Sequence, residues 1–96
     1  MRFEWDDQKN EINIRKHGIP FTTAVLIFED PNCLTFPERI EAGEARWHAI
    51  GAVQGSLLFL TVVHTYGEQG AEQIVRIISA RRANNREKRR YAEAIL

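Results

Sequence analysis

The chain has 96 residues, and its 13 lysines and arginines balance 13 aspartates and glutamates, so the net charge gives no reason to expect a polyanionic partner. The length predicts a single domain over residues 1–96. With no apolar run near the roughly 20 residues of a membrane helix and no charged-then-apolar leader, we expect a cytoplasmic protein without membrane contact. The charge is nevertheless segregated, because basic residues dominate from Arg76 to Leu96, and this stretch predicts either a phosphate-binding surface or a solvated helix face.

The N-terminal third predicts a strand followed by two helices. Residues 2–5 have strand character, and Asp6 or Asp7 then caps a helix that runs to Lys16 and ends at Gly18. A second, short amphipathic helix is predicted from apolar residues at helical spacing, and it is closed by Glu29, Asp30 and Pro31. The apolar positions of this helix are Phe21, Ala24, Val25 and Phe28.

The rest of the chain predicts a sheet and a last helix. A strand near 33–37 precedes three more, 45–53, 56–65 and 72–81, which we interpret as an antiparallel meander. Gln54-Gly55 fits a tight hairpin, whereas the Gly-Glu-Gln-Gly segment around 67–70 fits a looser one. Asn84-Asn85 with Glu87 predicts the start of a C-terminal helix. The fold class is therefore α+β: a small twisted antiparallel sheet with two N-terminal helices on one face and a C-terminal helix.

Alternation along the meander separates a core face from a polar face, if both hairpins keep even-numbered residues together. The odd face is then the core under the N-terminal helices, with Trp47, Ala49, Leu57, Phe59, Val63, Val75 and Ile77. The even face gathers polar side chains near one end of the sheet, namely Glu44, Arg46, His48, His64, Tyr66 and Arg76. Singly, the arginines fit ion pairs with Glu44 and Glu72, and the histidines fit half-buried strand positions. Their convergence predicts a site.

Arg76 is the residue that most needs an explanation, because a charge at the centre of an apolar strand requires a partner or a ligand. The three histidines, at 17, 48 and 64, show no metal-ligand spacing, and the single Cys33 is expected to be a small buried or half-buried residue. We therefore expect neither a metal nor a cofactor. A small metalloenzyme that uses two or three of the histidines ranks last among the alternatives.

The order of residues along nearly the whole chain resembles the BrnT family of type II toxins. The similarity rests on Phe3-Glu4-Trp5-Asp6, Lys9, Asn13, Lys16-His17-Gly18, Phe21, Ala24, Phe28, Asp30-Pro31, Gly43-Glu44 with Arg46, Gly51, the strand end from Arg76 to Arg82, Glu87 and Tyr91. The resemblance implies a RelE-like fold, a ribonuclease that arrests translation, and an antitoxin of the BrnA type. Operator DNA would then be bound mostly by the antitoxin, within the complex.

Metal-free RNA cleavage needs a base for the 2′-hydroxyl, cations for the phosphorane and an acid for the leaving oxygen. The residue types present match these roles: Arg46, Arg76 and Arg81 for the phosphate, Glu44 or His64 as base, and His64 or His48 as acid. Arg81 has odd parity and is included because of the resemblance. Lys16, His48, Arg82 and Arg86 are the further expected RNA-binding residues. A different class of function is a non-catalytic nucleic-acid-binding or partner-binding module that acts in autoregulation, for which the basic C-terminal helix is suited.

Overall fold

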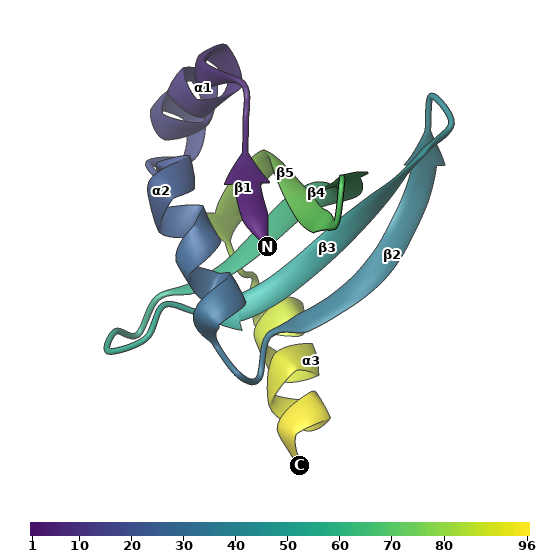
Figure 1. Ribbon diagram of the computed structural model, residues 1–96. Helices are drawn as coiled ribbons and strands as arrows, with labels where there is room; N and C mark the ends of the chain where they lie inside the picture. The colour runs from purple at the N-terminus through teal and green to yellow at the C-terminus, as the bar shows by residue number, and fades with distance from the viewer.

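A five-stranded sheet forms the centre of the computed structural model, which describes residues 1–96 (Figure 1). The strand order is β1 (Arg2–Glu4), β5 (Glu72–Arg82), β4 (Phe59–Gln69), β3 (Glu44–Ala52) and β2 (Leu34–Glu41). The pairs β2–β3, β3–β4 and β4–β5 are antiparallel, whereas β1 runs parallel to β5. The fold is α+β as predicted, but the sheet is mixed rather than antiparallel, because the first strand joins the outer edge of the last one. No helix has the length and apolar character needed to cross a membrane.

The helices form where their local signals predict. In α1 (Asp7–His17) the Asp6 carboxylate accepts the amides of Gln8 and Lys9, and Gly18 ends the helix at a left-handed φ of 72°. The second helix is α2 (Phe21–Ala24), which tightens into the 3₁₀ turn η1 (Val25–Glu29). Helix α3 (Asn85–Ile95) starts with a reciprocal capping box between Asn84 and Glu87. It lies at the opposite end of the molecule from α1 (Figure 1).

Two apolar clusters lie on opposite faces of the sheet. The larger one packs Ile19 and the inner faces of α2 and η1 against the sheet; it contains Ile19, Phe21, Ala24, Ile27, Ala49, Leu60, Val62, Val75, Ile77 and Ala80. The smaller one places Tyr91 of α3 against Ile50 and Ala83, and covers only one end of the other face. Cys33 is half-buried beside the larger cluster, as expected, and burial raises the pKa of its thiol to about 11. The rest of the second sheet face is left to polar side chains.

Asn13 attaches α1 to the edge of β5. Strand β1 pairs only with residues 74–76 of β5, so the backbone groups of Ala80 further along that edge need another partner. The Asn13 amide nitrogen donates to the carbonyls of Ala80 and Ile19, both at 2.8 Å, and its oxygen accepts the Ala80 amide at 3.1 Å. The Asn13 side chain thereby takes the place of a neighbouring strand.

The prediction that even-numbered residues share one face was wrong. Strand β3 pairs odd with even residues of β4, as in Trp47 opposite His64 and Ala52 opposite Phe59. A loop of residues 53–58, wider than the expected Gln54-Gly55 turn, produces this register, with the Val53 amide donating to the Leu58 carbonyl. Phe59 and Val63 therefore leave the predicted core face, and Leu57 is 94% exposed in the loop.

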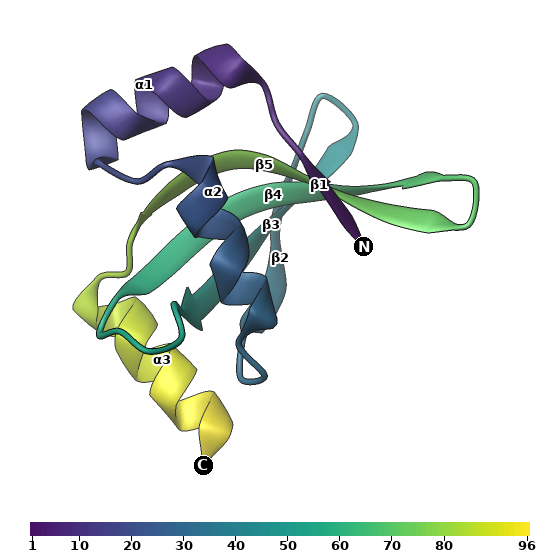
Figure 2. The ribbon, with the colours of Figure 1, turned by 60° about the vertical axis from the view of Figure 1, so that its left-hand side comes forward.

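The second hairpin is tighter than predicted. Strand β4 continues to Gln69, which pairs with Glu72, so that only Gly70 and Ala71 form the turn. A two-residue turn also closes the β2–β3 hairpin, at Ala42 and Gly43, both with positive φ. The β4–β5 hairpin consequently extends beyond the rest of the sheet as a paired ribbon (Figure 2).

Gly51 lets η1 approach the sheet closely, and replacing it by alanine tests this contact. A Cβ at this position would lie 2.9 Å from the Ile27 Cβ and 3.1 Å from the Ile27 carbonyl oxygen. We expect Gly51→Ala to lower the free energy of unfolding by about 1–3 kcal/mol, measured by urea denaturation. Gly67→Ala is the matched control, because nothing lies within 4 Å of a Cβ there. Equal stability losses in the two variants would contradict the close packing.

Candidate functional site

The sheet face opposite η1 carries a group of polar and basic side chains, which we call the basic face: Arg46, His48, Arg76, Ser79 and Arg81. Cross-strand pairs place them together, because directly paired residues share a face. His48 lies opposite Val63, which lies opposite Ser79, and Thr65 lies opposite Arg76. Two residues further along β3 on the same face, Ile50 lies opposite Thr61, which lies opposite Arg81. Helix α3 borders this face at the Ile50 end.

A bulge in β5 brings Arg76 and Arg81 onto the same face. The register shifts at Val63 and His64, which pair with Ser79 and Ile77 and leave Ile78 as an extra residue. Without this extra residue, an even-numbered and an odd-numbered side chain of one strand would point in opposite directions. Arg81, which was expected in the site from the family resemblance and from a twist or end of the strand there, therefore lies on the same face as Arg76.

Arg76 and Glu44, which the sequence placed together, line one shallow hollow of about 200 Å³. The partner of Arg76 is Glu4 of β1, with 3.2 Å between Nη1 and Oε1, rather than Glu72. Both side chains are more than 40% exposed, so this pair contributes little to stability. Arg76 is the only basic side chain in this hollow, which three carboxylates also line, so a phosphate bound there would have to displace Glu4. Arg46 similarly pairs with Glu41 across 3.7 Å rather than with Glu44.

Arg81 is held in a fixed orientation by Glu87. Its two terminal nitrogens donate to the two carboxylate oxygens at 2.7 and 2.8 Å, which is bidentate geometry. Burial alone would raise the pKa of Glu87, but the hydrogen bonds from Arg81 and the Asn84 amide outweigh it and lower the pKa to about 2. The sequence predicted Glu87 only as a helix cap. Its second role, the orientation of Arg81, depends on a contact between α3 and β5 that no local sequence pattern predicts.

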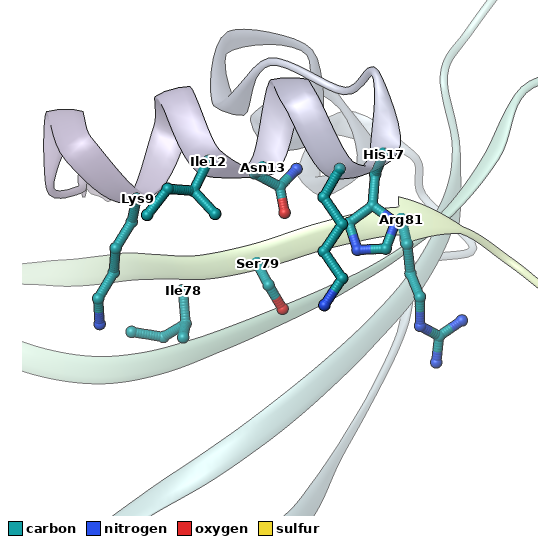
Figure 3. Close-up of a pocket in the computed structure, with 8 residues that line it drawn as sticks. Lys9, Ile12, Asn13, His17, Ile78, Ser79 and Arg81 are labelled. Atoms are coloured by element: carbon teal, nitrogen blue, oxygen red, sulfur yellow. The ribbon is translucent and has the colours of Figure 1, made fainter.

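A pocket of about 380 Å³ lies between α1 and β5 (Figure 3). Its basic lining consists of Lys9, Lys16, His17 and Arg81, and no carboxylate lines it. Figure 3 shows Lys9 and His17 from the helix and Ser79 and Arg81 from the strand around this space. Lys16 thus lies near Arg81, as the predicted site requires. Two lysines around a hollow that no carboxylate lines suit a phosphate group, and Arg81 adds the donors that its pair with Glu87 leaves free.

A second pocket of about 290 Å³ is lined by His48, Arg86 and Arg90, together with the carboxylates of Glu38 and Glu87. The His48 Nδ1 lies 3.0 Å from the Glu38 carboxylate, and the ring meets Phe36 edge-on. The Arg90 guanidinium lies 3.7 Å above the same Phe36 ring. The sequence analysis missed Glu38 and Arg90. Pro37 was the available signal for Glu38, since proline in a strand indicates an edge position or a bulge.

His64 and Arg82 do not belong to the basic face. His64 is fully buried under η1, between Phe28 and Tyr66, and burial lowers its pKa to about 4. It is therefore neutral at pH 7 and separated by the sheet from the predicted phosphate ligands, so its expected role as base or acid is corrected. Arg82 pairs with Leu60, whose side chain lies in the larger core cluster, and projects away from Arg81.

Asp30 joins α3 to the strands below the site. Its carboxylate accepts the Tyr91 hydroxyl at 2.6 Å and the amides of Ala52 and Asn32 at 2.9 Å. Burial by itself would raise the pKa of Asp30, but these hydrogen bonds outweigh burial and leave the pKa below the ordinary 3.8. The stability contributed by the ionised group is therefore present above about pH 4 and is lost as the pH falls through its lowered pKa.

Tyr91→Phe tests this link. Because the hydroxyl bonds to a charged group, we expect the variant to lose about 1–3 kcal/mol of unfolding free energy at pH 7. The loss should shrink at pH values below the lowered pKa of Asp30, where the carboxyl is protonated. Urea denaturation at pH 7 and in acid measures both. A double-mutant cycle with Asp30→Asn must show coupling at pH 7, and additive losses would show that the two groups act separately.

An α+β domain with basic side chains gathered on one sheet face and around the adjoining pockets is typical of proteins that bind phosphate groups, including those of nucleic acids. A family model described as "Ribonuclease toxin, BrnT, of type II toxin-antitoxin system" matches residues 5–87. The chain belongs to this family, which confirms the predicted resemblance. Members of the family are ribonuclease toxins with an antitoxin partner. No match to the chain was found among curated proteins.

Proposed function

We propose that this toxin is a metal-independent endoribonuclease with a RelE-like fold, which cleaves RNA on the basic face and so arrests translation in the cytoplasm. Its partner would be an antitoxin of the BrnA type, and operator DNA would be bound only through their complex. The observation that carries the proposal is the alignment of Arg76 and Arg81 on one open sheet face by the β5 bulge. Two arginines on one face can hold one bent RNA backbone from two sides.

The phosphate roles follow from the contacts of each side chain. Arg81 uses two of its nitrogens on Glu87, so its orientation is fixed while its remaining donors can reach an RNA oxygen. Arg76 and Arg46 have single, long contacts to carboxylates, which an incoming phosphate can replace. These three arginines would hold the scissile phosphate and stabilise the extra charge of the phosphorane. Lys16, with Lys9 and His17, would bind a neighbouring phosphate, and Arg86 one on the other side.

Support for a reaction without a metal ion comes from the ligand geometry. No three histidine, cysteine or carboxylate side chains lie close enough together to hold an ion. The arginines would then supply the positive charge, and the ribose 2′-hydroxyl would be the nucleophile.

The proposal is tested by inducing the chain alone in a bacterial host and by assaying the purified protein on RNA. We expect growth arrest with RNA cleavage, cleavage that persists in EDTA, and products ending in a 2′,3′-cyclic phosphate. A substrate with 2′-deoxyribose at the cleaved position should resist. Normal growth and intact RNA with folded protein would remove the proposal, and loss of cleavage in EDTA would remove its metal-independent part.

A further inference from the structure

Glu38 occupies a bulge in the edge strand β2. Pro37 pairs with Trp47 and Arg39 with Arg46, so Glu38 is an extra residue without a cross-strand partner. The Glu38 carboxylate lies on the basic face because Glu38 is two residues from Phe36, the cross-strand partner of His48, and it is 3.0 Å from the His48 Nδ1. The register shift in β2 leaves Glu38 unpaired on this face, and the shift in β5 aligns Arg81 with Arg76.

The His48 ring is held on a further side by an aromatic contact. Phe36, its cross-strand partner, packs edge-on against it with ring centroids 5.6 Å apart, and the His48 side chain is only 17% exposed. A carboxylate on Nδ1 selects the tautomer in which Nδ1 carries the proton and Nε2 has a free lone pair. His48 also lines the pocket that contains Arg86 and Arg90, so a bound RNA phosphate has cations close to this imidazole.

We infer that His48, positioned by Glu38, is the group that removes the proton from the ribose 2′-hydroxyl. This assignment rests on the proposed ribonuclease function and names its general base. Neutral His48 takes the proton at Nε2, the 2′-oxygen forms a bond to the adjacent phosphorus, and the bond from phosphorus to the 5′-oxygen breaks. The leaving 5′-oxygen keeps the electron pair and takes a proton from water. Glu38 stabilises the imidazolium that results.

The position of His48 relative to the arginines suits this step. Arg46 lies two residues away on the same strand and face, at a spacing of about 7 Å. Ser79 lies two strands away in the same row, roughly 10 Å across the sheet, and Arg81 is the next residue of β5 on that face. Long arginine side chains from both sides can therefore reach a phosphate next to His48. Glu44, one of the two bases expected from sequence beside His64, is exposed at the β2–β3 turn and has no histidine partner.

The test is single-turnover cleavage of an end-labelled RNA of mixed sequence by purified full-length variants. We expect His48→Ala to lower the cleavage rate about 10²–10⁴-fold and added imidazole to restore part of it. Glu38→Gln should lower the rate about 10–100-fold. In the His48→Ala background Glu38→Gln should cause no further loss, because Glu38 acts only through His48. Affinity for the same RNA fully 2′-O-methylated should change less than about threefold, since both residues act in the reaction step.

Two other Glu→Gln variants complete the design. Glu29→Gln, exposed at the end of η1, makes the same chemical change outside the site and should cleave at the wild-type rate. Glu44→Gln should retain more activity than Glu38→Gln, and the reverse order would return the base to Glu44. Wild-type cleavage that survives in His48→Ala would overturn the inference while leaving the ribonuclease function intact. Absence of cleavage by the wild-type protein would remove both.

Discussion

Replacing Arg76 by alanine is expected to lower the rate of RNA cleavage by about 10²–10³-fold, because the variant loses a guanidinium that meets the developing charge of the phosphorane. Growth arrest should disappear with it. The stability of the fold should change by less than about 1 kcal/mol, since the ion pair of Arg76 with Glu4 is exposed. Cleavage of a defined RNA and urea denaturation of the same preparation measure the two effects separately.

Two variants sharpen the interpretation of Arg76→Ala. Arg76→Lys keeps the charge and loses the forked donor geometry, so it should recover only part of the rate. Arg82→Ala removes another arginine of the same strand, whose side chain lies off the basic face. The cleavage rate of this variant should be at least tenfold higher than that of Arg76→Ala. Full activity in Arg76→Ala, or equal losses at both positions, would show that the basic face is not the site of cleavage.

The largest loss of stability is expected from Asn13→Asp. The substitution keeps the side-chain shape but places a carboxylate oxygen where the amide nitrogen donates to the carbonyls of Ala80 and Ile19. Asn13 is 4% exposed, so these acceptors lose their donor without access to water. We expect the free energy of unfolding to fall by about 3–5 kcal/mol at pH 7, which is a large part of the stability of a small domain. Thermal and urea unfolding measure it.

Asn10→Asp is the matched control on the same helix. The Asn10 side-chain oxygen accepts the Phe21 amide at 2.8 Å, and a carboxylate accepts it equally well. We expect a change below about 1 kcal/mol. If both substitutions cost the same, the proposed pairing of Asn13 with the β5 edge does not hold α1 in place.

Helix ends could be predicted from the sequence because they depend on local chemistry. Asp6, Gly18 and the pair Asn84 and Glu87 each satisfy or terminate backbone groups within a few residues, and all act as predicted. Faces of strands could not be predicted in the same way. The register between β3 and β4 depends on a loop in which Gln54-Gly55 resembled a tight turn, and one residue of difference exchanges the faces.

The candidate site could be predicted only in part, because the face of each β4 residue depends on the same register between β3 and β4. Arg46, His48 and Arg76 share a face as expected, whereas His64 does not, because β4 pairs with the opposite parity. A histidine in an apolar strand gives no local indication of which face it occupies. Glu38 and Glu87 acquire their roles from partners in other elements, His48 and Arg81, through contacts that a single sequence does not reveal.

The most direct test of the proposed cleavage site on the basic face is to map where a non-cleavable RNA binds. Uniformly 2′-O-methylated RNA is titrated into the labelled wild-type protein, and the shifts of backbone and arginine side-chain NMR signals are followed. If RNA binds on the basic face, the largest shifts fall on Arg46, His48, Arg76 and Arg81, with Lys16 beside them. Shifts confined to Arg82 and the outer face of α3, with the basic face unchanged, would contradict the proposed site.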